Sequence, residues 1–272
     1  MNTKNKTFDL YIDRGVVDKV NFKNKDLLCI LALALEHYKN QGVFGDEFHR
    51  DISCTPEILW RNIIGMDANR TDRKKFIDSL ERLKNHGLIT IDFKSDKDVK
   101  IMWNTYLEIN AEALIHNPNN SFIMVNTVDI NSMCVNNYNT LTTLVQCYVS
   151  IVSYFDMSQI REFDEAIKNK EKPIDYSYDL YGKIDLHISC WASHDRLMTT
   201  KHSSDKSREQ WITKPTLIKM LNLLEEISLI SIVKTNINGK DFSNHYCYPR
   251  HKKYVEMIAK RMAEQQDHAR KH

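Results

Sequence analysis

Residues 52–91 read ISCTPEILWRNIIGMDANRTDRKKFIDSLERLKNHGLITI, and this stretch decides the fold. Ser53 or Thr55 can cap a helix whose first turn contains Pro56, because both hydroxyls can accept a hydrogen bond from a free backbone N–H group. Gly65 is placed to end this helix. Its apolar side is formed by Ile58, Leu59, Ile63 and Ile64.

A second helix is predicted over Thr71–His86, where apolar residues recur at helical spacing and Gly87 stands at the position of a left-handed cap. A hairpin follows, with strands expected over Leu88–Phe93 and Val99–Ile109 and a polar turn at Ser95–Asp98. The inward face of the predicted helix consists of Phe76, Ile77, Leu80 and Leu83.

The residues before this stretch complete a recognisable order of elements. Asp26–Tyr38 has apolar residues at helical spacing, and Phe48–Ser53 is a short extended segment. Helix, short strand, two helices and a hairpin is the order of a winged helix-turn-helix domain. We therefore expect an α+β fold that is mainly α.

The second half of the chain repeats the pattern, because Leu80, Leu83, Leu88 and Ile89 recur 141 residues later. The alternative is a chance coincidence of common leucines. The repeat predicts two winged helix-turn-helix domains in tandem. Helices and strands of the second copy are expected over Leu141–Phe155, Ile184–Ser189, Ser193–Thr200, Thr213–Ile227, Leu229–Lys234 and Asp241–Tyr248, with a tight turn at Asn238-Gly239.

Two offsets between the copies indicate where the second domain differs from the first. Early helices match at an offset of 113 and later ones at 141, so the second copy contains an insertion, which we place near 157–183. The predicted domains are therefore residues 1–115, residues 116–249 with this acidic, Tyr-rich insertion, and a basic C-terminal helix or tail over 250–272.

Charge is distributed unevenly along the chain. The formal net charge is +2 overall, but it is 0 over residues 1–115, −4 over 116–185 and +6 over 186–272. The basic C-terminal third is suited to face an anionic partner. The longest apolar run is too short to span a bilayer, and the polar N-terminus has no signal-peptide core, so we expect a cytoplasmic protein without membrane contact. The six cysteines contain no Cys-x-x-Cys pair and are expected to be reduced.

Basic residues cluster on the second helix of the opening stretch, which in a helix-turn-helix protein lies in the DNA major groove. A merely solvated helix face, with Asp72, Asp78 and Glu81 as salt-bridge partners, is the alternative. The wing of this copy offers one more cation at its tip, where wings touch phosphates. The predicted DNA-binding residues of the first copy are Arg70, Arg73, Lys74, Lys75, Arg82 and the wing-tip Lys97.

The second copy offers a comparable set on its third helix, in the polar loop before that helix and at its wing tip. The loop either lies along the DNA backbone or is a surface loop without a partner. These predicted residues are Lys214, Thr216, Lys219 and Asn222 on the helix, Lys201, Lys206 and Arg208 in the loop, and Lys240 on the wing.

Enzyme motifs are incomplete throughout the chain. There is no Gly-x-x-x-x-Gly-Lys phosphate-binding loop, and no His-x-His pair occurs among the 11 histidines. His245-x-Cys247 has two metal-binding side chains, but alternation on a wing strand explains their spacing better. We therefore expect no catalytic residues, no metal and no cofactor.

The blocks Ile52–Ile91 and Thr216–Ile230 resemble the winged-helix domains of replication proteins in Gram-positive plasmids and phages. These are the DnaD-like N-terminal domains and the tandem winged-helix initiators. The resemblance implies a sequence-specific protein of a mobile element that binds double-stranded DNA at an origin or operator and recruits replication or host proteins. The near-neutral first half and the acidic insertion differ from that family, so one copy could bind DNA while the other binds protein.

Three classes of function therefore remain open. The first is a DNA-binding replication initiator, or a transcription regulator with the same fold. The second is a protein-interaction module that captures a host protein, with Tyr176, Tyr178 and Tyr181 in its interface. The third is a metal-dependent nuclease. We favour the initiator, and a homodimer on paired half-sites stays open because two copies in one chain could bind both half-sites alone.

Overall fold

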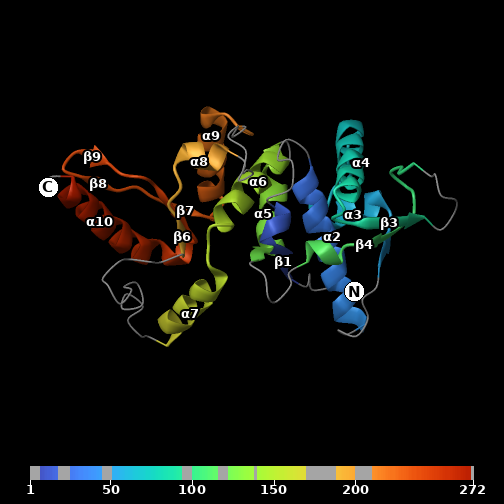
Figure 1. The fold of residues 1–272 in the computed structure, drawn as a ribbon, viewed down its shortest axis with the longest axis horizontal. Helices are drawn as coiled ribbons and strands as arrows, with labels where there is room; N and C mark the ends of the chain where they lie inside the picture. The colour runs from blue at the N-terminus through green and yellow to red at the C-terminus, as the bar shows by residue number, and fades with distance from the viewer. Residues whose placement is uncertain are drawn as a thin grey trace. The chain divides into compact units, whose positions relative to one another are not determined.

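A computed structural model describes most of the chain as an α+β, mainly helical protein (Figure 1). It divides into two compact units, each described by itself below: unit 1 is Met1–Gln146 with Thr200–Trp211, and unit 2 is Cys147–Thr199 with Ile212–His272. The described residues are 7–17, 25–44, 51–93, 100–115, 122–137, 140–169, 188–199 and 210–270.

Unit 1 contains a helix, a short strand, two helices and two further strands in that order. The two outer strands of its antiparallel sheet both pair with β4, so that Ile109 lies between Ile52 and Ile91. The elements are α2 (Asp26–Phe44), β2 (Ile52–Cys54), α3 (Pro56–Ile64), α4 (Arg70–Asn85), β3 (Thr90–Phe93) and β4 (Leu107–Asn110).

Local signals fix the ends of these helices. The Thr55 hydroxyl caps α3 by accepting a hydrogen bond from the Ile58 N–H group, and Gly65 ends α3 with a φ of 76°. Asn69 caps α4 by accepting a hydrogen bond from the Asp72 N–H group, so that the helix begins at Arg70, one residue before the predicted start. Gly87 has the predicted positive φ, at 66°.

The core of unit 1 forms around α2, in which every side chain from Leu27 to Leu35 is buried. α2 packs against α3, α4, β1 and β2, which explains why it is apolar on all sides. The helix α4 buries only the face that includes Phe76, Leu80 and Leu83. Its opposite face is therefore left for solvent or a partner.

A second sheet joins the N-terminal residues to a later segment of unit 1. β1 (Asp9–Asp13) pairs antiparallel with β5 (Phe122–Asn126) over five residues, and Leu10, Ile12, Ile123 and Val125 are buried between the flanking elements. Residues 116–146 therefore belong to unit 1, whereas the predicted division lies at residue 115. The remaining elements here are α1 (Arg14–Val17), η1 (Glu112–Leu114) and α5 (Thr127–Asn137).

Unit 2 repeats the order of elements found in unit 1. Its antiparallel sheet has the strand order β6-β10-β7, which matches β2-β4-β3 position by position. The elements are α6 (Leu141–Val152), which begins in unit 1, then α7 (Met157–Lys168), β6 (Ser189–Cys190), α8 (His194–Met198), α9 (Lys214–Glu226), β7 (Ser231–Val233), β8 (Asn236–Ile237), β9 (Lys240–Asp241), β10 (His245–Cys247), η4 (Pro249–His251) and α10 (Lys252–Ala269).

Two predicted strands are shorter in the structure. The returning strand predicted over Val99–Ile109 is present only at its end, because Met102–Thr105 forms a turn and β4 begins at Leu107; Val99 lies outside the described residues. The predicted strand Asp241–Tyr248 is split into β9 and β10. Between β8 and β9 the predicted tight turn is present, with φ of 53° at Asn238 and 77° at Gly239.

The predicted insertion near 157–183 is described only in its first part. There α7 is held by Asp164, whose carboxylate accepts hydrogen bonds from the Arg250 guanidinium, with Nη2 at 2.9 Å from Oδ2, and lies 2.6 Å from His251 Nε2. Tyr176, Tyr178 and Tyr181 lie outside the described residues.

All six cysteines lie within the described ranges, where they are buried and free of disulfides. Across the described residues, no helix has both the length and the apolar character needed to cross a bilayer.

Candidate nucleic-acid interface

Two ion pairs fix the helix α4, which carries most of the predicted DNA-binding residues of unit 1. In the first turn, Asp72 Oδ1 lies 2.9 Å from the ammonium of Lys25. In the last turn, the Arg82 guanidinium holds the buried carboxylate of Asp26, with Nη2 at 2.6 Å from Oδ1. Lys25 and Asp26 are consecutive at the start of α2, so one end of α2 fixes both ends of α4.

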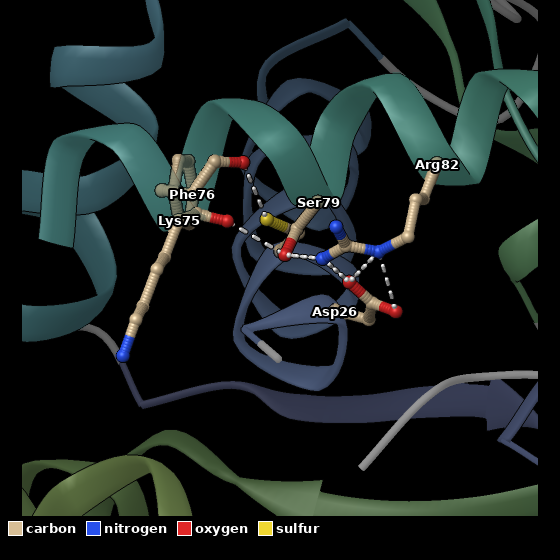
Figure 2. Close-up of polar contacts among 6 residues, drawn as sticks. Asp26, Lys75, Phe76, Ser79 and Arg82 are labelled. Atoms are coloured by element: carbon tan, nitrogen blue, oxygen red, sulfur yellow. Dashed lines mark hydrogen bonds and ion pairs between the residues drawn. The ribbon is translucent and has the colours of Figure 1, made fainter. Parts of the chain in front are cut away.

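Figure 2 shows that Arg82 belongs to a polar cluster on the inner side of α4. Its Nη2 also donates to Ser79 Oγ at 2.7 Å, and the Ser79 hydroxyl donates to the Lys75 carbonyl at 2.9 Å. The prediction placed Arg82 among the DNA-binding residues, whereas its guanidinium is engaged inside unit 1. Lys75 differs, because its side chain points away from the cluster.

The outward face of α4 is basic mainly in its first half. Arg70, Lys74 and Lys75 are exposed, and their side chains make no hydrogen bond or ion pair with the described residues. Acidic side chains appear further along the same helix, at Asp78 and Glu81, which are half-buried. The cations are therefore concentrated at the N-terminal half, which is the part of a recognition helix that approaches base edges and phosphates.

Arg73 connects this basic half of α4 to the segment before β4. Its Nε donates to the Ala68 carbonyl at 2.9 Å, and its guanidinium lies over the Trp103 ring, 5.5 Å from the centroid. Trp103 also contacts Trp60 and Phe76 edge to face. Arg73 is exposed, but its position is set by these contacts, so its charge is presented in a fixed place.

In unit 2 the corresponding helix is α9, where Lys214, Lys219 and Asn222 are exposed. Thr216 is half-buried and its hydroxyl lies 2.9 Å from that of Thr213. Ile218 is also exposed, so this face is less basic than the first half of α4. Burial, with the charge of Lys214 as a second cause, lowers the pKa of His194 nearby.

Lys240, which was predicted to touch DNA at the wing tip of unit 2, instead lies beside an acidic side chain of α10. The ammonium of Lys240 lies 3.2 Å from the carboxylate of Asp267 on α10. Its charge is thus partnered within the unit. The remaining predicted DNA-binding residues, Lys97, Lys201, Lys206 and Arg208, lie outside the described residues.

His245 and Cys247, the two side chains considered above for a metal, both lie on β10. No group of three His, Cys, Asp or Glu side chains suited to a metal ion occurs among the described residues. Burial lowers the pKa of His245 to about 4 and raises that of Cys247 to about 12, so both are neutral at pH 7. They pack as part of the sheet.

Comparisons with known proteins add nothing to this geometry, since no protein-family model, curated protein or solved structure matches the chain.

Several residues that shape the candidate interface were missed by sequence reasoning. Lys25, Asp26 and Trp103 position α4, and Asp267 holds the wing tip of unit 2. Their partners are 27 to 56 residues away in the sequence, so helical or strand periodicity could not identify them.

Proposed function

We propose that this protein binds double-stranded DNA through two winged helix-turn-helix domains, one in each unit. The order of elements supports this proposal, because a helix, a strand, two helices and a hairpin occur in both units. The strand orders β2-β4-β3 and β6-β10-β7 support it as well, since the strand before the helix pair lies at the edge beside the returning wing strand.

The observation that carries the proposal is the exposed cation group of Arg70, Lys74 and Lys75 on α4, whose side chains have no ion pair among the described residues. An ordinary solvated helix satisfies its charges with neighbours three or four residues away. Asp78 stands four residues after Lys74 and three after Lys75, but no ion pair joins it to either lysine among the described residues, and Asp72 is bound to Lys25 on α2. The three cations are therefore available to phosphates and base edges.

As the biological output we favour initiation of replication of a plasmid or phage, with the protein bound at origin sequences. This part of the proposal rests on the resemblance of residues 52–91 and 216–230 to initiator winged helices. Transcription regulation from an operator would use the same surface. Catalysis is not part of the proposal.

A fluorescence-anisotropy titration with random-sequence duplex DNA at about 50 mM salt tests the proposed surface. Lys74→Glu/Lys75→Glu removes two cations and introduces two anions at exposed positions, so we expect affinity to fall at least about tenfold. The matched control is Lys252→Glu/Lys253→Glu, which makes the same change at an adjacent exposed pair on α10.

The two double variants should differ clearly in their affinity for duplex DNA. A large loss in the α4 variant and a small one in the α10 variant would support DNA binding through α4. Equal losses would show only that net charge matters, and they would contradict α4 as the interface. Circular dichroism of both variants verifies that the fold is intact.

A further inference from the structure

The wing of unit 2 is fastened to the C-terminal end of α10. Figure 1 shows β8 and β9 as a ribbon that runs beside this helix. Asp267, in the last turn of α10, accepts a hydrogen bond from Asn238 Nδ2 at 2.9 Å and binds Lys240 Nζ at 3.2 Å. A second contact joins the same two segments, because the Arg270 guanidinium lies over the ring of Phe242, 5.7 Å from its centroid.

These contacts occupy the groups that a wing tip would offer to DNA. Asn238 and Lys240 flank Gly239 at the turn, and both of their polar ends are directed to one carboxylate. The Asp267 side chain is only 4 % exposed, so its charge is well shielded from water and interacts strongly with the ammonium. Lys240 itself is 54 % exposed, which leaves the pair within reach of a competing anion.

The helix α10 does not depend on this end for its attachment. Its other buried residues, Val255, Ile258, Ala259 and Ala263, all precede Asp267, and the helix contacts β7 and β10 as well as β8. Beyond Ala263, the side chains other than Asp267 are exposed up to Arg270. Release of the last turn would therefore expose little apolar surface.

We propose that Asp267 is an autoinhibitory latch, which holds the unit 2 wing closed and withholds Lys240 from DNA. The inference rests on the proposed DNA-binding function. DNA phosphate and the Asp267 carboxylate compete for the same ammonium, so unit 2 gains its wing contact only when the latch opens. The unlatched protein therefore has one more phosphate contact than the latched one.

The test compares Asp267→Asn with wild type in anisotropy titrations against duplex DNA. Asparagine keeps the shape of the side chain but removes the charge that binds Lys240. We expect tighter binding, with an advantage that shrinks roughly threefold between about 50 and 200 mM salt, as one added phosphate contact requires. The matched control is Glu264→Gln, which removes one negative charge from an exposed position on the same helix that has no hydrogen bond or ion pair with the described wing residues.

Lys240→Gln is a second variant, at an exposed site where the substitution should not disturb folding. In the wild-type background it should leave the affinity unchanged, because the latched lysine makes no phosphate contact. In the Asp267→Asn background, Lys240→Gln should abolish the gain in DNA affinity. If Lys240→Gln weakens the wild-type protein, the wing already contacts DNA and the latch is refuted.

The outcomes also separate this inference from the proposed function. Equal gains from Asp267→Asn and Glu264→Gln, in a protein whose binding depends on Lys74 and Lys75, would overturn the latch and leave DNA binding intact. Failure of both wild type and Asp267→Asn to bind duplex would overturn both.

Discussion

Arg82 on α4 holds the carboxylate of Asp26, the first residue of α2, with two of its guanidinium nitrogens. The neighbouring Lys25 binds Asp72, ten residues earlier on α4. Ten residues of helix span about 15 Å, so two adjacent residues fix α4 at two widely separated points. The basic half of α4 is thereby held in one orientation, which a recognition surface requires.

Arg82→Met should destabilise the protein without touching the proposed DNA surface. The substitution keeps much of the side-chain stem but removes the guanidinium that the Asp26 carboxylate, only 4 % exposed, binds. Removal of one partner of a buried ion pair lowers the free energy of unfolding by several kcal/mol. Because Arg82 is partly exposed, we expect a smaller loss of about 2 kcal/mol. Urea unfolding monitored by circular dichroism measures the change.

Arg70→Met is the control, because it removes an exposed arginine from the same helix. It should change the free energy of unfolding by less than about 0.5 kcal/mol while weakening DNA binding. Equal stability losses in the two variants would contradict the structural role of Arg82.

The caps of α4 and α9 should differ in their contributions to stability. Asn69 Oδ1 accepts a hydrogen bond from the Asp72 N–H group at 2.8 Å, whereas Thr213 makes no side-chain bond to the backbone of α9. Asn69→Ala should therefore cost about 1 kcal/mol, and Thr213→Ala clearly less. Thermal and urea unfolding of both variants measure the two losses in free energy of unfolding. A larger loss for Thr213→Ala than for Asn69→Ala would contradict the prediction.

His245 should make the protein less stable in mild acid. Burial lowers its pKa from 6.5 to about 4, so below pH 6.5 the unfolded state takes up a proton that the folded state does not bind. The contribution to stability is complete above pH 6.5 and is lost as the pH falls toward 4. Between pH 7 and 5 the free energy of unfolding should fall by about 2 kcal/mol from this group.

His245→Gln removes this proton-linked term and should flatten the pH dependence over that range. His86→Gln, at an exposed position, should leave it unchanged. An identical pH profile in wild type and His245→Gln would assign the acid sensitivity to other groups, of which His251 and His194 also have lowered pKa values because of burial.

Short-range signals in the sequence located the elements well where a cap or turn residue marked a boundary. Thr55, Gly65 and Gly87 end or begin helices as predicted, and Asn238-Gly239 forms the predicted turn. Each of these depends on local backbone geometry, which neighbouring residues determine.

Long-range pairings escaped the same reasoning. β1 pairs with β5 across more than 100 residues, and nothing in either strand specifies the other. The cation Arg82 looks like Lys74 or Lys75 in a helical pattern, yet its guanidinium turns inward because Asp26 is buried beside it. Lys240 was predicted to face DNA, and only the fold brings Asp267 to it.

The salt dependence of duplex binding reports how many phosphates the two proposed recognition helices contact. Arg70, Lys74, Lys75, Lys214 and Lys219 are five exposed cations of the two proposed recognition helices. If all five contact phosphates, the observed association constant should fall with salt with a logarithmic slope of about −4 to −5. Absence of duplex binding at low salt, or binding with a slope near zero, would contradict the account.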